Sequence, residues 1–352
     1  MVCRDARAVR ARALCRAWLR GIAIGAIAAA TMATGVAPSC AATGADAVVT
    51  ALAREQGRRC VVTRGTGPNE ALHVTVVGDA CDGRGFIRAI RALLTSSDAK
   101  AAPLDLDLDI DAKTLDGFNG ETLRDVKLLL SVQRGVIAAF RLAAKLGDRD
   151  VSGGMGATKD DRPTIRFEAG DAGAFLRWAG LYRRMRGGVL NIAMYVPTAA
   201  GAVDDGVAYL HAFAITGDPA LRPLARWLPD PRHGAPAPFA VARLRVAFKS
   251  QSGRVTFSEG LLTGEPTAAT LAGSFDLGQN RLDLGGVVIP TLQVSPIAPI
   301  FFPETSGLFG SDYTISGPPS APVLRIDPLR VLAPRFLRQL FEFKPRDKSL
   351  AP

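Results

Sequence analysis

The stretch LDLDLDID at residues 104–111 alternates strictly between an aliphatic and an acidic side chain. Successive side chains of a β-strand point to opposite faces, so this stretch predicts a strand with one apolar and one acidic face. A similar period of two follows at residues 126–132 and 136–146, with the turn Arg134-Gly135 between them. These stretches predict an antiparallel meander with one face in water and the other face covered.

Four more strands are predicted between residues 241 and 289, where alternating runs are separated by turns of hairpin length. We expect about ten to twelve strands in all. Three or four short helices are also predicted, at residues 86–94, 171–188, 218–228 and 334–343. The expected fold class is α+β and mainly β: an elongated, twisted antiparallel sheet, built as a meander of hairpins with a groove-like face.

The composition excludes several classes of protein. The chain has 352 residues, of which 48% are hydrophobic and 22% charged, so it contains enough apolar material for a folded core. The net charge is +10, but residues 1–42 hold six arginines against one aspartate and so carry half of it. No basic stripe with interleaved aromatic residues follows, so a nucleic-acid partner is not expected.

Residues 1–42 are predicted to be a signal peptide or an N-terminal membrane anchor. An arginine-rich start is followed by the uncharged, apolar residues 21–38 and then by small residues. Both interpretations place the body of the chain in the periplasm, tethered to the inner membrane by residues 21–38 if they are retained. We expect a short mixed α/β lead-in at 43–100, a β-rich region at 101–343 and a disordered tail at 344–352.

The body contains two cysteines, Cys60 and Cys81, separated by 21 positions. In an oxidising compartment this spacing allows a disulfide. The alternative is that both are small buried side chains without a bond.

Little in the sequence points to catalysis. The chain has three histidines, His73, His211 and His233, and it lacks both a G-x-S-x-G motif and a phosphate-binding loop. The aspartates of residues 105–111 spread along about 20 Å of one strand face, so they do not converge on a cation. We expect no enzyme activity, no cofactor and no metal site. A periplasmic hydrolase that uses one of the histidines is the least favoured class.

Several segments together resemble the C-terminal region of AsmA-like proteins, which are large envelope proteins of diderm bacteria. The similarity covers about residues 76–343, and this chain looks like a short or truncated member, because relatives are usually several times longer. The segments that carry the resemblance are Asp82–Phe86, Gly117–Leu123, the predicted helix 171–188, Leu271–Phe275, Gly307–Gly310, Asp327–Leu329 and Ala333–Leu337.

The resemblance implies a non-enzymatic protein whose long sheet curls into a groove with an apolar interior. The implied role is phospholipid transport between the inner and outer membranes and the maintenance of outer-membrane integrity. Expected partners are phospholipid, one or both membranes and an envelope protein. The residues expected to face lipid are Leu104, Leu106, Leu108, Ile110, Val126, Leu128, Leu130, Leu244, Val246 and Phe248.

Two alternatives accompany this interpretation. The apolar strand face is equally consistent with a strand that packs on the protein's own helix, since side chains and acyl chains are equivalent apolar cover. The runner-up function is a structural or assembly protein that docks another envelope protein by its sheet edge. The C-terminal helix could close the end of the sheet or contact a membrane; its membrane-contact candidates are Phe336, Leu337, Leu340 and Phe341.

Overall fold

The structure is a computed structural model. It describes residues 60–66, 72–88, 105–133, 136–196, 204–221, 238–251, 254–264, 267–276, 279–290, 309–319 and 322–332.

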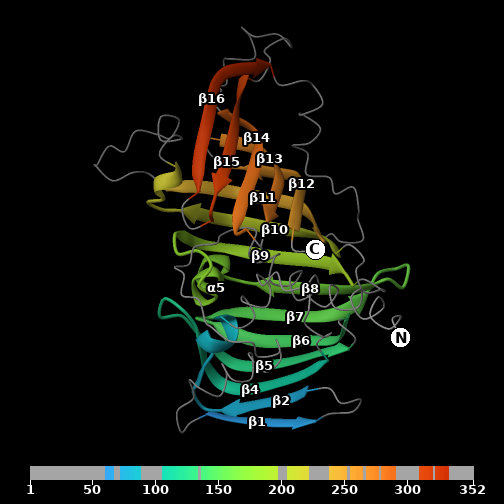
Figure 1. Ribbon diagram of the computed structural model, residues 1–352. Helices are drawn as coiled ribbons and strands as arrows, with labels where there is room; N and C mark the ends of the chain where they lie inside the picture. Colours follow the sequence, from blue (N-terminus) through green and yellow to red (C-terminus); the bar gives the residue numbers. More distant parts are fainter. Residues whose placement is uncertain are drawn as a thin grey trace, which may run out of the picture.

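These residues form one open sheet of sixteen strands (Figure 1). From β4 onward, each strand pairs with the strand that follows it in the chain, and all of these pairs are antiparallel. The prediction of a mainly β, meandering sheet is confirmed, with more strands than the ten to twelve expected. The strands are β1 (Cys60–Thr66), β2 (Leu72–Gly78), β3 (Cys81–Asp82), β4 (Leu106–Asp116), β5 (Thr122–Gln133), β6 (Val136–Leu146), β7 (Arg149–Ala157), β8 (Pro163–Ala169), β9 (Met185–Tyr195), β10 (Asp204–Ile215), β11 (Phe239–Gln251), β12 (Arg254–Thr263), β13 (Thr267–Asp276), β14 (Arg281–Pro290), β15 (Phe309–Gly317) and β16 (Val323–Leu332).

The start of the sheet departs from the antiparallel expectation. β2 and β3 both pair with β4 in parallel, with Val76 opposite Ile110. Parallel neighbours need a crossover connection, which residues 79–105 supply. The lead-in strands β1 to β3 therefore belong to the same sheet as the rest of the body.

The prediction of three or four short helices is wrong for the described part of the chain, which contains two. They are α5 (Ala172–Trp178) and a short helix at residues 84–88. Of the predicted helix 218–228, residues 219–221 form one turn, in which the Asp218 carboxylate accepts the Ala220 N–H at 2.9 Å. The rest of that segment and the predicted helix 334–343 lie outside the described residues.

Helix α5 is also shorter than predicted. The Asp171 carboxylate caps its N-terminus as expected and accepts the Ala174 N–H at 2.8 Å. The helix stops after Trp178 because Gly180 adopts a φ of +64°, and the Leu181 N–H then closes on the Leu176 carbonyl at 2.7 Å. The glycines at 187 and 188, which were expected to end the helix, lie inside β9.

Three strands carry an irregularity that bends the sheet. Asp125 in β5, Ala212 in β10 and Glu259 in β12 have φ values of 51°, 52° and 51°. The pairing register shifts beside Asp125 and beside Glu259, as expected at β-bulges, which increase local twist. In Figure 1 the strands from β12 to β16 run steeply across the direction of β1 to β10.

Candidate functional site

One face of the sheet is apolar across its whole width, and we call it the apolar face. Residues that stand directly opposite one another on neighbouring strands form continuous lanes across this face. Because register fixes which side chains share a face, such lanes show that the apolar pattern of each strand matches that of its neighbours. One lane crosses ten strands from β1 to β11: Val62, Val76, Ile110, Leu128, Leu142, Gly153, Phe167, Ile192, Ala208 and Val246.

A second lane continues the apolar face to the other end of the sheet. At Gly206 in this lane, an aromatic ring fills the space of the missing side chain. A Cβ on Gly206 would lie 2.5 Å from the Phe248 ring. The second lane crosses nine strands from β8 to β16: Ile165, Met194, Gly206, Phe248, Phe257, Gly273, Leu284, Ile315 and Leu324.

Of the residues expected to face lipid, those that the structure describes lie on this apolar face, where they join a single hydrophobic cluster. Most of them are covered. Leu128 and Leu244 are half-buried, whereas Leu106, Leu108, Ile110, Val126, Leu130, Val246 and Phe248 are buried. Leu104 lies outside the described residues.

Helix α5 covers one end of the apolar face. The Trp178 ring stacks on Phe175 with ring centroids 5.8 Å apart, and its indole N–H donates to the Leu115 carbonyl at 3.1 Å. Gly117, at the end of β4, allows this approach, since a Cβ there would lie 2.2 Å from the Trp178 ring. The short helix at 84–88 lies at the same end of the strands (Figure 1).

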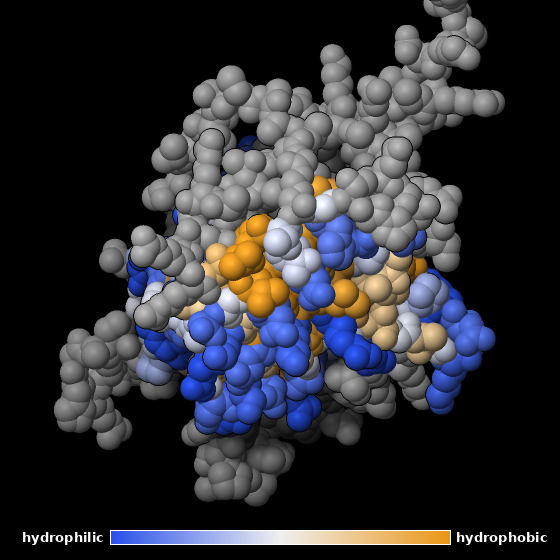
Figure 2. Space-filling view, turned by 90° about the horizontal axis from the view of Figure 1, so that it is seen from below, coloured by the Kyte–Doolittle hydropathy of each residue, from blue (hydrophilic) through white to orange (hydrophobic). Residues whose placement is uncertain are grey.

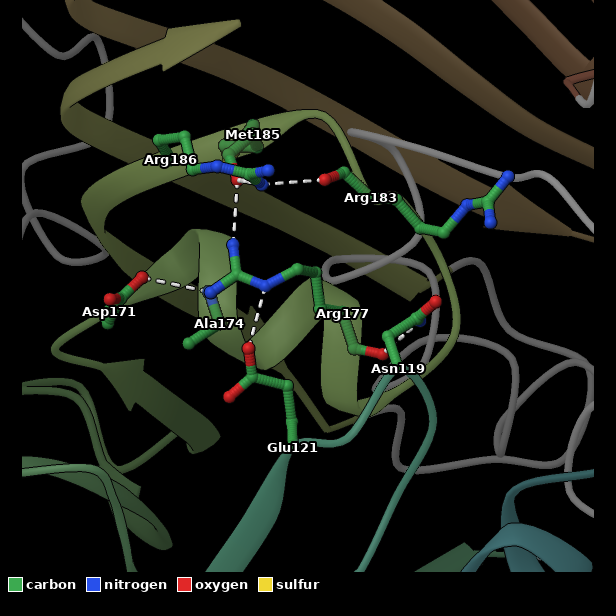
Figure 3. A network of polar contacts seen from close by, with 8 residues as sticks. All are labelled: Asn119, Glu121, Asp171, Ala174, Arg177, Arg183, Met185 and Arg186. Carbon is green, nitrogen blue, oxygen red and sulfur yellow. Dashed lines mark hydrogen bonds and ion pairs between the residues drawn. The ribbon is translucent and has the colours of Figure 1, made fainter. Parts of the chain in front are cut away.

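Polar contacts fix α5 to the strands on either side of it. Arg177 donates to the Glu121 carboxylate at 2.7 Å and to the Met185 carbonyl at 2.9 Å, and the Asn119 amide donates to the Arg177 carbonyl at 2.8 Å (Figure 3). Arg177 and Glu121 are 20% and 25% exposed, so this ion pair is partly shielded from water. The helix is therefore held between the β4–β5 turn and the start of β9.

The cover on the apolar face becomes thinner toward β16. On β4 and β8 its residues are mostly buried, whereas near the β16 edge Leu282, Ile315, Leu324 and Ile326 are half-buried. This region therefore offers apolar surface that is only partly covered. The alternation of apolar residues along the strands does not distinguish it from β4 and β5.

The other end of the sheet is closed by a disulfide and exposes a small apolar patch. Cys60 in β1 is bonded to Cys81 in β3, with their Cα atoms 5.2 Å apart. Val61 and Val77 stand opposite one another on β1 and β2 and are 60% and 51% exposed. Seen from this end, apolar residues gather in the middle of the molecule with hydrophilic residues beside them (Figure 2).

The opposite face of the sheet, which we call the outer face, carries the aspartate row of β4. Asp109 and Asp111 are exposed, and Asp107 accepts a hydrogen bond from the Ser131 hydroxyl at 2.6 Å. Within the described ranges no three His, Cys, Asp or Glu side chains are grouped as ligands of a metal ion would be.

The structure does not bring together the two histidines that it describes. His73 lies on β2 and contacts the Thr75 hydroxyl at 3.2 Å, and His211 lies far along the sheet on β10. His233 is outside the described residues.

His211 lies on the outer face with its ring parallel to that of Tyr209, the ring centroids being 6.3 Å apart. Burial, assisted by the positive charge of Arg243 opposite it on β11, lowers the pKa of His211. As the pH falls below about 6.5, His211 therefore takes up a proton more readily in the unfolded chain than in the folded chain.

We expect the free energy of unfolding to fall as the pH drops through this range, and to fall less in the variant His211→Gln. Urea unfolding of both proteins at pH 7.5 and pH 5.5 measures the difference. An identical loss of stability in the two proteins would contradict the assignment.

A shallow hollow of about 440 Å³ lies on the outer face over β7 to β10. The hollow was not predicted, because its residues are spread over four strands and two of those strands, β7 and β8, were not expected from the sequence. Ser152, Glu168, Asn191 and Tyr209 form one lane across the hollow. The only feature of the sequence that points to the hollow is the group of glycines around Gly154, because glycines leave open space on a sheet face.

The expected membrane contacts at Phe336, Leu337, Leu340 and Phe341 lie outside the described residues, as do residues 21–38. Among the residues that are described, no helix combines the length and the apolar character that crossing a bilayer requires.

No protein-family model matches the chain, and no curated protein or solved structure matches it either.

Proposed function

We propose that this chain is a non-enzymatic protein of the cell envelope that binds phospholipid acyl chains on the apolar face of its sheet. In this role it contributes to lipid transport and outer-membrane integrity. The observation that carries the proposal is the continuity of the apolar face, whose lanes run from β1 to β16 in an open sheet. A long apolar strip of this kind suits acyl chains, because the hydrophobic effect is non-directional and proportional to the area covered.

The position of bound lipid follows from the exposure of the apolar face. Seven of the residues expected to face lipid are buried by the protein itself, so they offer no surface to a ligand. The half-buried side chains near the β16 edge are the better contact, because acyl chains would complete their cover. We therefore place acyl binding at Leu282, Ile315 and Leu324, on strands β14, β15 and β16.

A pair of charges in this region tests the proposal. The variant Ile315→Asp, Leu324→Asp places two carboxylates opposite one another on the apolar face. Burying a charge against acyl chains costs several kcal/mol, so we expect at least a tenfold loss of co-purified phospholipid. Mass spectrometry of organic extracts gives the amount of lipid per protein.

The matched control is Thr314→Asp, Val323→Asp, which adds the same charge to the outer face of the same two strands. Thr314 and Val323 are exposed, so this variant should keep its lipid. Wild-type protein without lipid, or an unchanged amount in the apolar-face variant, would overturn the proposal.

The runner-up is a structural or assembly protein that docks an envelope partner by edge pairing. The observation in its favour is the exposed Val61–Val77 pair on the two strands nearest the β1 edge, where β1 has a single neighbour among the described strands. A photoreactive side chain at position 61 separates the two functions, because edge pairing would cross-link it to a polypeptide, whereas lipid binding near β16 would not.

A further inference from the structure

We infer that the hollow on the outer face is a binding site for a saccharide ring, separate from the apolar face and independent of lipid binding. Its volume of about 440 Å³ lies within the range of about 300–1,000 Å³ typical of small-molecule sites.

The floor of the hollow is made of small residues whose size the fold does not require. A Cβ added to Gly154 would meet nothing nearer than the Phe140 carbonyl oxygen at 3.9 Å, and one added to Gly156 nothing nearer than the Thr164 hydroxyl at 3.8 Å. By contrast, Gly153 on the apolar face is needed, since its Cβ would lie 2.6 Å from the Phe140 ring. Gly154 and Gly156, which lie on the outer face, therefore leave space that neighbouring side chains do not fill.

Polar groups lie beside the small residues of the floor. Gly154 and Ala193 stand on either side of Arg166 in one lane across β7 to β9, and the neighbouring lane holds Ser152, Glu168, Asn191 and Tyr209. A ligand in the hollow would thus meet small residues on the floor and polar groups at the edge.

The polar edge suits a neutral ligand with many hydroxyl groups. Within the described ranges, the side chains of Glu168 and Asn191 make no hydrogen bond, and both line the hollow. Carboxylate and amide groups supply acceptors and donors together. Arg166 and Glu168 place one charge of each sign on the lining of the hollow. A sugar ring has a C–H face for the floor and hydroxyl groups around its edge.

Binding of two neutral trisaccharides, maltotriose and tri-N-acetylchitotriose, tests the inference by isothermal titration calorimetry. We expect saturable binding of at least one, with a dissociation constant of about 1 mM or below. The variant Gly154→Leu extends a side chain into the hollow from a position where a Cβ meets no close atom, and it should weaken binding at least tenfold. Asn191→Ala removes polar contacts from the edge and should weaken it in the same direction.

The matched control is Ala139→Leu, which adds the same kind of side chain to the outer face of β6, outside the hollow. This variant should bind as the wild type does. Vesicles with and without a lactosyl lipid show whether a sugar attached to a membrane is also bound. Absence of saturable binding to both trisaccharides and to the lactosyl vesicles, or equal binding by folded Gly154→Leu protein, would overturn the inference. Neither result would bear on the lipid extracted from the apolar-face variants.

Discussion

Replacing Trp178 with alanine is expected to lower the free energy of unfolding by about 3–5 kcal/mol. Trp178 is 8% exposed and joins α5 to β4 through its ring contacts and its hydrogen bond to Leu115. The variant leaves a cavity between α5 and the apolar face, and it leaves the Leu115 carbonyl without its donor. Equilibrium unfolding in urea measures the loss.

The control is Trp178→Phe, which keeps an aromatic ring on Phe175 but lacks the indole N–H. We expect a smaller loss, because an unpaired buried acceptor alone costs about 1–3 kcal/mol. If the alanine variant is no less stable than the phenylalanine variant, α5 does not depend on packing at this position.

Removing the disulfide is expected to cost about 3 kcal/mol, as for other loops of this length. The variant Cys60→Ser, Cys81→Ser frees two residues 21 positions apart. The unfolded chain gains conformational freedom, and the edge strand β1 loses its covalent link to β3. Thermal and urea unfolding of the oxidised wild type and of the variant measure the difference.

Reductant provides the control for this second prediction. Dithiothreitol should lower the stability of the wild type to that of the variant, and it should leave the variant unchanged. A wild-type protein whose unfolding is insensitive to reductant would contradict the assigned bond.

The strands that were predicted well have strong alternation. In β4, Leu106 to Ile110 alternate with aspartates, and the structure buries the aliphatic side chains and leaves Asp109 and Asp111 exposed. The hairpins β11 to β14 were also predicted, because alternating runs are separated there by turns of hairpin length. Local pattern is sufficient where one face is apolar, because a shift by one residue would turn every side chain to the other face.

β7, one of the strands that were missed, lacks that pattern. β7 contains the run from Gly153 to Gly156, which has few side chains and low strand propensity. It is a strand because both neighbours pair with it and because Phe140 fills the space over Gly153. The glycines at 187 and 188 led to the opposite error, in which part of a strand was predicted as a helix. Glycines are found at the ends of helices as well as in bulged strands.

The candidate site was predictable in part. Alternation identified which side chains share the apolar face, and the register confirms that shared face for β4 and β5. How thoroughly that face is covered depends on distant elements such as α5, and it does not follow from any single strand. The hollow on the outer face arises from four strands in register, so no local stretch could reveal it.

The pairing order of the sheet has a consequence for how such a chain can change in length. From β4 to β16 every strand pairs with its neighbours in sequence, so contacts spread stepwise along the chain, as they do in repeat proteins. A hairpin could be inserted or deleted within this run without rerouting any other connection. Each added hairpin would extend the molecule by about 10 Å, which makes its reach a quantity that evolution or an engineer can adjust in regular steps.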